Sequence, residues 1–256
     1  MVTGASRGIG RALAVALADR GATVGLAART TPDLEKLSAD LPGTHHVLVC
    51  DVALKASVQS AVDDFIAVAG GLELVVVNAG VAHYEPVMEQ NTEKIEHMTE
   101  VNWLGTVYTV KAALPHLVAA GRGHIVVMSS GAGLRSFPGA AGYSATKAAQ
   151  RAFADALRHE LAGTGVSVTT VFPGEVATSL HDHERGSMPA WYRSDERAAS
   201  AEELAAIVLD AVDHDRRYVH FRRAVKGMRI LSGVSPGLAD VVLRRLRGPT
   251  AAPRRD

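Results

Sequence analysis

The chain has 256 residues, of which 47% are hydrophobic and 21% charged, and its formal net charge is zero. This composition supports a folded core and excludes a disordered or collagen-like chain. The single cysteine, Cys50, excludes an internal disulfide and favours a reducing compartment. No apolar run approaches the roughly 18–20 residues that span a bilayer, and the start of the chain lacks the apolar region of a signal peptide. We therefore expect a cytoplasmic protein with one domain.

Short β-branched runs alternate with longer segments of helical periodicity over roughly the first 175 residues. The short runs are apolar without alternation, which is typical of strands buried on both faces. This order predicts a Rossmann-type doubly wound α/β fold, a parallel sheet with helices on both sides. The expected strands are 22–28, 46–50, 74–78, 124–128 and 166–172, and the expected helices are 11–20, 53–69, 92–119 and 143–161.

The end of the chain differs from the rest in charge. Residues 216–256 hold eleven Lys and Arg residues and two acids, a net charge of +9, which leaves −9 on the preceding body. We interpret 1–215 as the catalytic domain and 216–256 as a basic helical extension, with a final strand at 217–220. Apolar residues between the basic ones allow two interpretations: a tail docked on the oppositely charged body, or weak contact with an anionic membrane surface.

A glycine-rich segment, Thr3-Gly4-Ala5-Ser6-Arg7-Gly8-Ile9-Gly10, stands directly before the first expected helix. Glycines permit a tight turn and let backbone N–H groups approach a phosphate, and a helix N-terminus adds partial positive charge. Taken alone, the segment is explained equally well by a simple turn.

Further segments follow in a fixed order, and together with the glycine segment they resemble the short-chain dehydrogenase/reductase family from residue 2 to about residue 180. Ser130 stands 13 residues before Tyr143. The matching segments are Asp51-Val52, Asn78-Ala79-Gly80, Val101-Asn102-Trp103-Leu104-Gly105, Tyr143-Ser144-Ala145-Thr146-Lys147 and Pro173-Gly174-Glu175-Val176-Ala177-Thr178.

The resemblance implies a nicotinamide cofactor and the residues that hold it. It places the cofactor phosphates on the glycine segment, the adenine on Asp51 and Val52, and a substrate lid at about 179–200. It also implies that the segment 173–178 closes on the nicotinamide. The cofactor-binding residues implied in this way are Gly4, Ser6, Arg7, Gly8, Ile9, Gly10, Asp51, Val52, Asn78, Ala79, Gly80, Tyr143, Lys147, Pro173, Gly174, Val176 and Thr178.

Reduction of a ketone needs a hydride at carbon and a proton at oxygen, and the protein supplies the acid. Tyr143 is the candidate, but a free phenol has a pKa of about 10. Lys147 lies one helical turn further on, so we expect its ammonium to lower the pKa of Tyr143. Ser130 can hydrogen-bond the substrate oxygen, and the resemblance gives Asn102 a place in a proton relay. A tyrosine and a lysine at this spacing, without the other motifs, would indicate only a surface pair.

The choice of nicotinamide follows from the end of the second expected strand. An acid there would accept the adenosine ribose hydroxyls and repel a 2′-phosphate. This chain has Arg29 instead, whose guanidinium suits a phosphate, and Arg7 is a second cation. We therefore expect NADP(H).

Two features depart from the family pattern. Only Met1 and Val2 precede the first motif, which predicts a truncated first strand and unpaired neighbouring edges. The C-terminal glycines of many members are absent, and the tail is more similar to those of lipid- and steroid-type members.

The segment His181-Asp182-His183-Glu184 has metal-binding residue types but no third cluster, so we interpret it as a polar lid segment and expect no metal.

We predict an NADP(H)-dependent oxidoreductase that interconverts a ketone or aldehyde and an alcohol. Its catalytic residues would be Asn102, Ser130, Tyr143 and Lys147, and its substrate a small apolar molecule rather than a nucleic acid. We expect a homodimer or homotetramer formed through the helices 92–119 and 143–161, where Ala148, Ala149, Ala152 and Ala156 permit close approach. The alternatives are a non-catalytic NADP-binding protein and a membrane-surface enzyme acting on lipids or steroids.

Overall fold

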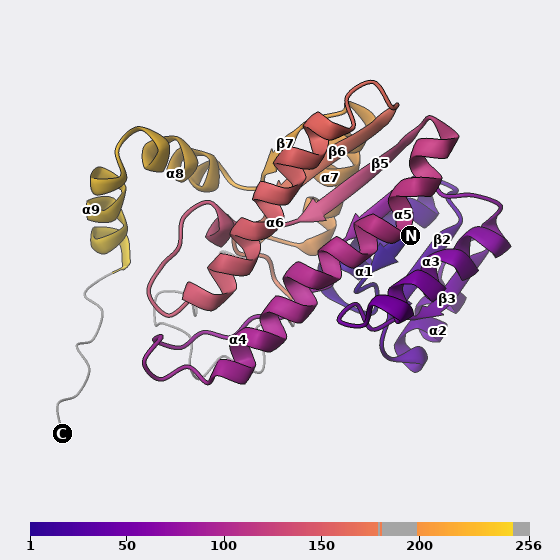
Figure 1. The fold of residues 1–256 in the computed structure, drawn as a ribbon, viewed down its shortest axis with the longest axis horizontal. Coiled ribbons are helices and arrows are strands. Elements are labelled where there is room, and N and C mark those ends of the chain that lie inside the picture. Colours follow the sequence, from indigo (N-terminus) through magenta and orange to yellow (C-terminus); the bar gives the residue numbers. More distant parts are fainter. Residues whose placement is uncertain (179, 181–198, 248–256) are drawn as a thin grey trace.

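Seven parallel strands form one continuous sheet at the centre of the molecule (Figure 1). The computed structural model describes residues 1–178, 180 and 199–247. The strand order is β3-β2-β1-β4-β5-β6-β7 and all pairings are parallel, which confirms the doubly wound fold. The strands are β1 (Val2–Thr3), β2 (Val24–Ala28), β3 (His45–Val49), β4 (Leu74–Val77), β5 (Gly123–Met128), β6 (Val166–Phe172) and β7 (Tyr218–His220).

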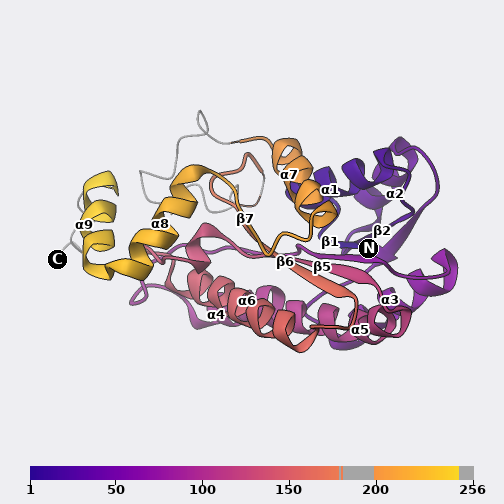
Figure 2. The same cartoon turned by 90° about the horizontal axis from the view of Figure 1, so that it is seen from above.

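Helices cover both faces of the sheet, as the view from above shows (Figure 2). Each layer of helices closes a separate apolar core against one face, because the side chains of a strand alternate between the two faces. One face carries α1 (Gly8–Asp19), α2 (Thr31–Asp40) and α7 (Ala201–Asp213). The other carries α3 (Lys55–Ala69), α5 (Gly105–Ala120) and α6 (Ala141–Glu160).

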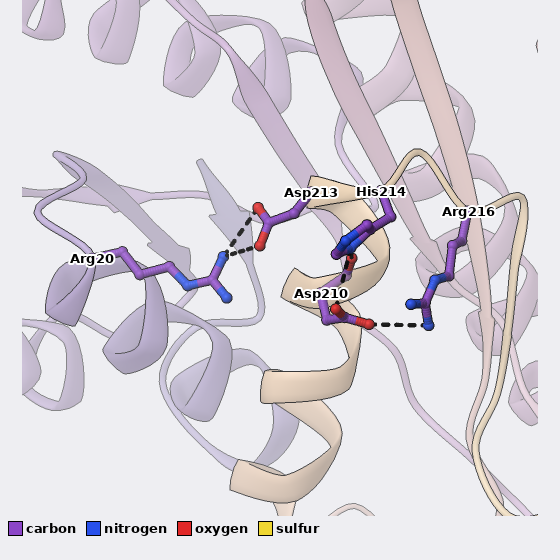
Figure 3. A network of polar contacts seen from close by, with 5 residues as sticks. All are labelled: Arg20, Asp210, Asp213, His214 and Arg216. Carbon is purple, nitrogen blue, oxygen red and sulfur yellow. Dashed lines mark hydrogen bonds and ion pairs between the residues drawn. The ribbon is translucent and has the colours of Figure 1, made fainter.

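Two of these helices were not expected from the sequence. In α2 only Leu34 and Leu37 are buried, so its apolar periodicity is weak. The helix α7 has a strong stripe that includes Leu204 and Val208, but it lies just beyond the segment that carries the motifs. Packing of α7 on α1 is reinforced by an ion pair of 2.9 Å between Arg20 and Asp213 (Figure 3).

The first strand has only two residues, yet it fills the centre of the sheet. Val2 pairs with Leu26 of β2 and with Val76 of β4. The amino group of Met1 donates a hydrogen bond of 2.8 Å to the Leu74 carbonyl, and the Met1 carbonyl accepts one of 2.9 Å from the Val76 N–H. Both neighbouring strands are therefore paired with β1, and the expectation of unpaired edges is wrong.

The expected single helix at 92–119 is divided into three parts. It consists of α4 (Thr92–Met98), a π-helical turn η1 (Thr99–Leu104) and α5, which follows without a gap. A π-helical turn inserts an extra residue and is found mostly at functional sites. The prediction of one regular α-helix is therefore wrong across η1, which contains Asn102.

The basic extension folds into a helical pair beyond the end of the sheet (Figure 1). It begins with β7, the final strand expected at 217–220, and continues as α8 (Arg223–Val234) and α9 (Pro236–Arg247). The Arg229 guanidinium lies 4.3 Å from the centre of the Tyr218 ring, and Asp240 forms an ion pair with Arg135. The pair of helices is therefore tied to the body, while Ile230 and Val234 on α8 stay 59% and 82% exposed.

None of the helices in the described parts of the chain is long and apolar enough to cross a membrane.

Candidate active site

A cleft of about 430 Å³ lies at the carboxyl ends of the strands. Ligands of open α/β sheets bind at such a position, where the strand order reverses between β1 and β4. Of the residues expected to bind cofactor or substrate, all but Gly10 and Asn102 line the cleft. Cleft residues that the sequence did not single out are Ala28, Thr30, Asp33, Cys50, Val81, Val101, Met128, Ser129 and Leu180.

The glycine segment forms a tight loop that opens α1. Gly4 and Gly8 have φ values of +66° and +55°, in the region that favours glycine. A side chain on Gly10 would place its Cβ 2.1 Å from the Gly4 carbonyl oxygen, so only glycine fits beneath the loop. The loop and the N-terminus of α1 thus expose backbone close to the cleft and fit a dinucleotide pyrophosphate.

Thr3 fixes this loop to the next strand, a role that the sequence analysis missed. Its hydroxyl donates to the Val76 carbonyl at 3.2 Å and accepts from the N–H groups of Asn78 and Ala79 at 2.9 and 3.2 Å. The Asn78 amide donates back to the Thr3 carbonyl at 3.0 Å. The two central strands are therefore locked together at the floor of the cleft, although 75 residues separate them in the chain.

The end of the cleft beside β2 and the glycine loop, where the adenosine was expected, carries charged side chains of both signs. Arg7 and Arg29 are exposed side chains on its wall, and Thr30 stands beside Arg29 at the start of α2. Asp33, in the first turn of α2, lines the same wall and introduces a negative charge near the two arginines. Asp51 lies opposite, with its carboxylate accepting the Ala53 N–H at 3.0 Å.

Ser130, Tyr143 and Lys147 meet at the other end. Ser130 follows β5, and its hydroxyl accepts the Ala132 N–H at 3.1 Å. Its side chain lies near enough to Tyr143 to affect the pKa of that residue. Tyr143 and Lys147 lie one turn apart on α6 and are 5% and 4% exposed. The Lys147 ammonium donates to the Met128 carbonyl at 2.9 Å and lies 5.8 Å from the centre of the Tyr143 ring.

Burial controls the ionisation of this pair. It raises the pKa of Tyr143 to about 12, an effect that the Ser130 side chain opposes. It lowers the pKa of Lys147 to about 7. The ammonium was expected to lower the pKa of Tyr143, but that pKa is raised, because desolvation is the largest effect on the phenol and Lys147 is directed to the Met128 carbonyl. The phenol stays protonated at neutral pH and can serve as a proton donor.

Asn102 lies behind the cleft wall and is fully buried. Its side-chain oxygen accepts the Val81 N–H at 2.8 Å, and its side-chain nitrogen donates to the Val81 carbonyl and the Thr146 hydroxyl at 2.9 and 3.0 Å. A Cβ on Gly80 would lie 3.1 Å from the Asn102 oxygen and 3.5 Å from the Lys147 nitrogen. The asparagine therefore joins the segment after β4 to the catalytic helix, and Gly80 leaves room for this approach.

The segment expected to close on the nicotinamide follows β6 and forms one side of the cleft. The Pro173 carbonyl accepts the Gly131 N–H at 2.8 Å, next to Ser130. Val176 forms a β-bridge with Ala199. Thr178 lies against the glycine loop, because a Cβ on Gly8 would be 3.2 Å from its side chain. Residue 179 and the expected lid residues 181–198, which include His181, Asp182, His183 and Glu184, fall outside the described residues.

An apolar wall stands beside Tyr143. Tyr84 contacts the Tyr143 ring edge-on, with 5.6 Å between ring centres, and Phe137 stacks on Tyr84 at 6.1 Å. Val81 and Leu180 pack into the same cluster. No group of three metal-ligating side chains occurs in the described parts of the chain.

The arrangement defines a dinucleotide-binding α/β protein with a Ser/Tyr/Lys group at one end of its cleft. The family model for short chain dehydrogenases matches residues 1–188. An uncharacterized oxidoreductase of Myxococcus xanthus is 40% identical over 192 residues, which cover 74% of this chain and 76% of that protein. The chain therefore belongs to the short-chain dehydrogenase/reductase family.

Solved structures of similar proteins contain both nicotinamide cofactors. An alcohol dehydrogenase of the archaeon Thermococcus sibiricus complexed with 5-hydroxy-NADP is 31% identical, with a TM-score of 0.74 over 86% of this chain and 93% of that chain. A short-chain dehydrogenase/reductase of Burkholderia phymatum in complex with NAD is 26% identical, with a TM-score of 0.81 over 98% of this chain and 95% of that chain. The chain is thus similar to both NADP-bound and NAD-bound proteins.

Proposed function

We propose that the protein is an NADP(H)-dependent oxidoreductase that interconverts a ketone or aldehyde and the corresponding alcohol. The observation that carries this proposal is the convergence of Ser130, Tyr143 and Lys147 on one end of the cleft, with Tyr143 and Lys147 one helical turn apart on α6. Membership of the family supports the general chemistry, and the cleft supports the assignment of the residues.

The side chains act on the oxygen of the substrate. NADPH, when bound, supplies the hydride. Ser130 donates a hydrogen bond that orients the substrate carbonyl. Tyr143, neutral because burial raises its pKa to about 12, donates its proton to the developing alkoxide. Burial lowers the pKa of Lys147 to about 7, so this residue can exchange a proton near neutral pH. Asn102 lies behind it and belongs to the same proposed proton relay.

The exposed arginines support a preference for NADP(H) over NAD(H). Arg29 follows β2 directly and offers a fork of donors for the 2′-phosphate, with Arg7 on the facing loop. Asp33 on the same wall works against a phosphate. The preference for NADP(H) therefore rests on the hydrogen-bond donors that Arg29 and Arg7 offer to the 2′-phosphate, and not on the total charge of this wall.

The apolar wall supports a small apolar carbonyl or alcohol as the substrate. The apolar side chains of Val81, Val101 and Leu180 line the cleft, and Val81 and Leu180 belong to the apolar cluster that contains Tyr143. A polar, highly charged substrate would lose its hydration there without replacement.

Of the two interpretations of the basic extension, the contacts favour docking. Val225 packs against the two catalytic loops, because Cβ atoms on Gly131 and Gly174 would lie 3.6 and 3.3 Å from its side chain. We propose that the extension covers one side of the substrate cleft. Truncation after Phe221, which keeps β7 in the sheet and removes α8 and α9, should then reduce stability. The full chain should not sediment with anionic liposomes at low salt. Salt-sensitive sedimentation that the truncation abolishes would instead establish the membrane-surface enzyme.

An oligomeric state and a cytoplasmic location are proposed from two further features, the small side chains on the surface of α6 and the lone cysteine. Ala152 and Ala156 are exposed on α6, and small side chains there permit close approach of a second copy in a homodimer or homotetramer. The lone thiol, Cys50, is free and buried, which suits the reducing cytoplasm.

The test of the proposed function is a panel of ketones, aldehydes and alcohols followed by NADPH absorbance. We expect turnover of apolar ketones with NADPH. Tight NADPH binding without turnover of any member would favour the non-catalytic NADP-binding protein.

A further inference from the structure

A second buried amide holds the π-helical turn that carries Asn102. Gln150 lies on α6, three residues beyond Lys147, and is fully buried at 0% exposure. Its side-chain nitrogen donates to the Asn102 backbone carbonyl at 2.9 Å and to the Thr106 hydroxyl at 2.7 Å. The contacts cross from the catalytic helix to the junction of η1 and α5.

These groups form a closed triangle of hydrogen bonds. The Thr106 hydroxyl donates to the same Asn102 carbonyl at 2.6 Å and accepts from Gln150. The hydroxyl thus uses its one proton and one lone pair, and Gln150 uses both of its amide hydrogens. Because the Asn102 carbonyl can only accept, the amide orientation follows from the contacts themselves.

The oxygen of the Gln150 side-chain amide makes no comparable contact. It is buried and finds no hydrogen-bond partner in the described parts of the chain. A buried carbonyl without a partner is destabilising, so an apolar side chain of similar length would pack at lower cost. The contribution of Gln150 therefore lies in the two bonds that its nitrogen makes.

The triangle continues into the catalytic residues. The Asn102 side chain donates to the Thr146 hydroxyl, which donates to the Tyr143 carbonyl at 2.8 Å. Gln150 and Thr146 therefore hold the asparagine from two successive turns of the helix that bears Tyr143 and Lys147. A π-helical turn has less regular hydrogen bonding than an α-helix, so it needs such contacts to persist.

We propose that Gln150 is a positioning residue for the oxidoreductase reaction. It holds the turn η1 against α6, so that Asn102 reaches Val81 and stays beside Gly80 and Lys147. The proposal rests on the proposed function, since its purpose is to fix the proton-transfer end of the site. Small misplacements of such groups cost large factors in rate.

The variant Gln150→Met separates positioning from stability. Methionine fills a similar volume, removes the unpartnered oxygen and cannot donate to Asn102. We expect an unchanged or higher Tm, unchanged NADPH affinity and KM, and a kcat reduced by about tenfold to 100-fold. Backbone hydrogen exchange in 99–106 should become faster.

Gln90→Met is the matched control, because the Gln90 oxygen is likewise buried without a partner in the described residues. It should leave kcat within about twofold of the wild type, on the scale at which surface and packing changes act. Equal losses of kcat in the two variants would overturn the proposal. So would a fall in kcat for Gln150→Met that only follows a loss of Tm and of NADPH affinity.

Hydrogen exchange distinguishes this proposal from the proposed function. If the wild type turns over no carbonyl, the proposed function fails, whereas exchange in 99–106 still reports whether Gln150 holds the turn. Unchanged exchange in Gln150→Met would overturn the positioning role whatever the activity.

Discussion

The two ends of the cleft are built in opposite ways. At the proposed catalytic end Tyr143 and Lys147 are almost fully buried, and Lys147 donates a hydrogen bond to the Met128 carbonyl. At the adenosine end Arg7 and Arg29 are exposed, and their side chains form no ion pair with other residues in the described parts of the chain. Desolvation therefore governs the first end, and solvent-screened charge governs the second.

The largest expected effect tests the buried end. Tyr143→Phe keeps the ring and removes the proton donor, so kcat should fall by at least ~100-fold. NADPH affinity, measured by fluorescence titration, should be retained because the adenosine end is unchanged. Near-normal turnover in this variant would remove Tyr143 from the mechanism.

The next effect tests the exposed end. Arg29→Ala should weaken NADPH binding by about 1.5–3 kcal/mol, the value of a charge-assisted hydrogen bond, and leave NADH nearly unaffected. The loss should shrink at high salt, because the site is open to solvent. Arg11→Ala, an exposed arginine on α1 outside the cleft wall, is the control. Equal losses for the two cofactors would show that Arg29 does not select the 2′-phosphate.

A pH effect on stability sharpens the comparison. Burial lowers the pKa of Lys147 to about 7 from an ordinary 10.5, so between these values the unfolded chain binds the extra proton. Unfolding free energy should then rise with pH in this window, by up to about 1.4 kcal/mol per pH unit. Below about 7 both states are protonated and the cost of the buried charge is fully present.

The measurement is urea unfolding of the wild type and Lys147→Met at pH 8.5 and 9.5. Burial lowers the pKa of the Met1 amine to about 5, so that group contributes little above pH 8.5. Tyr143, whose pKa is raised to about 12, stabilises the fold fully below 10 and loses that effect only as pH rises through 12. Burial raises the pKa of Cys50 to about 11, which lowers the unfolding free energy as pH rises through this window in both proteins. The wild type should therefore gain stability relative to the variant between the two pH values, and an equal pH dependence in the two would place the titration elsewhere.

A charge introduced on the exposed surface of α6 should have the smallest effect on the cleft. Ala152→Glu should lower the mass measured by light scattering from that of a dimer or tetramer, with little change in NADPH affinity, because it puts charge where α6 would meet its copy. Ala67→Glu on the exposed side of α3 is the control. A wild type that is monomeric at every concentration would reject the expected interface.

Local sequence patterns predicted most of the sheet and the cleft. The run Val166–Phe172 is a strand as expected, because an apolar β-branched segment fits a sheet buried on both faces. The motif residues met at the cleft because the carboxyl ends of parallel strands share one edge of the sheet. The regular helix expected through Asn102 failed, since the π-helical turn depends on contacts with Val81, Thr146 and Gln150 from other segments.

The sequence by itself determined the family chemistry of this protein: the glycine loop, the Ser/Tyr/Lys group and the parallel fold follow from residue types at short spacings. Only the tertiary structure decided how these groups ionise and what holds them. The Thr3 hydroxyl meets Asn78 from 75 residues away, and Lys147 turns to the Met128 carbonyl. Burial and hydrogen bonding arise when distant segments pack together, so no local pattern encodes the pKa of Tyr143 or the place of Asn102.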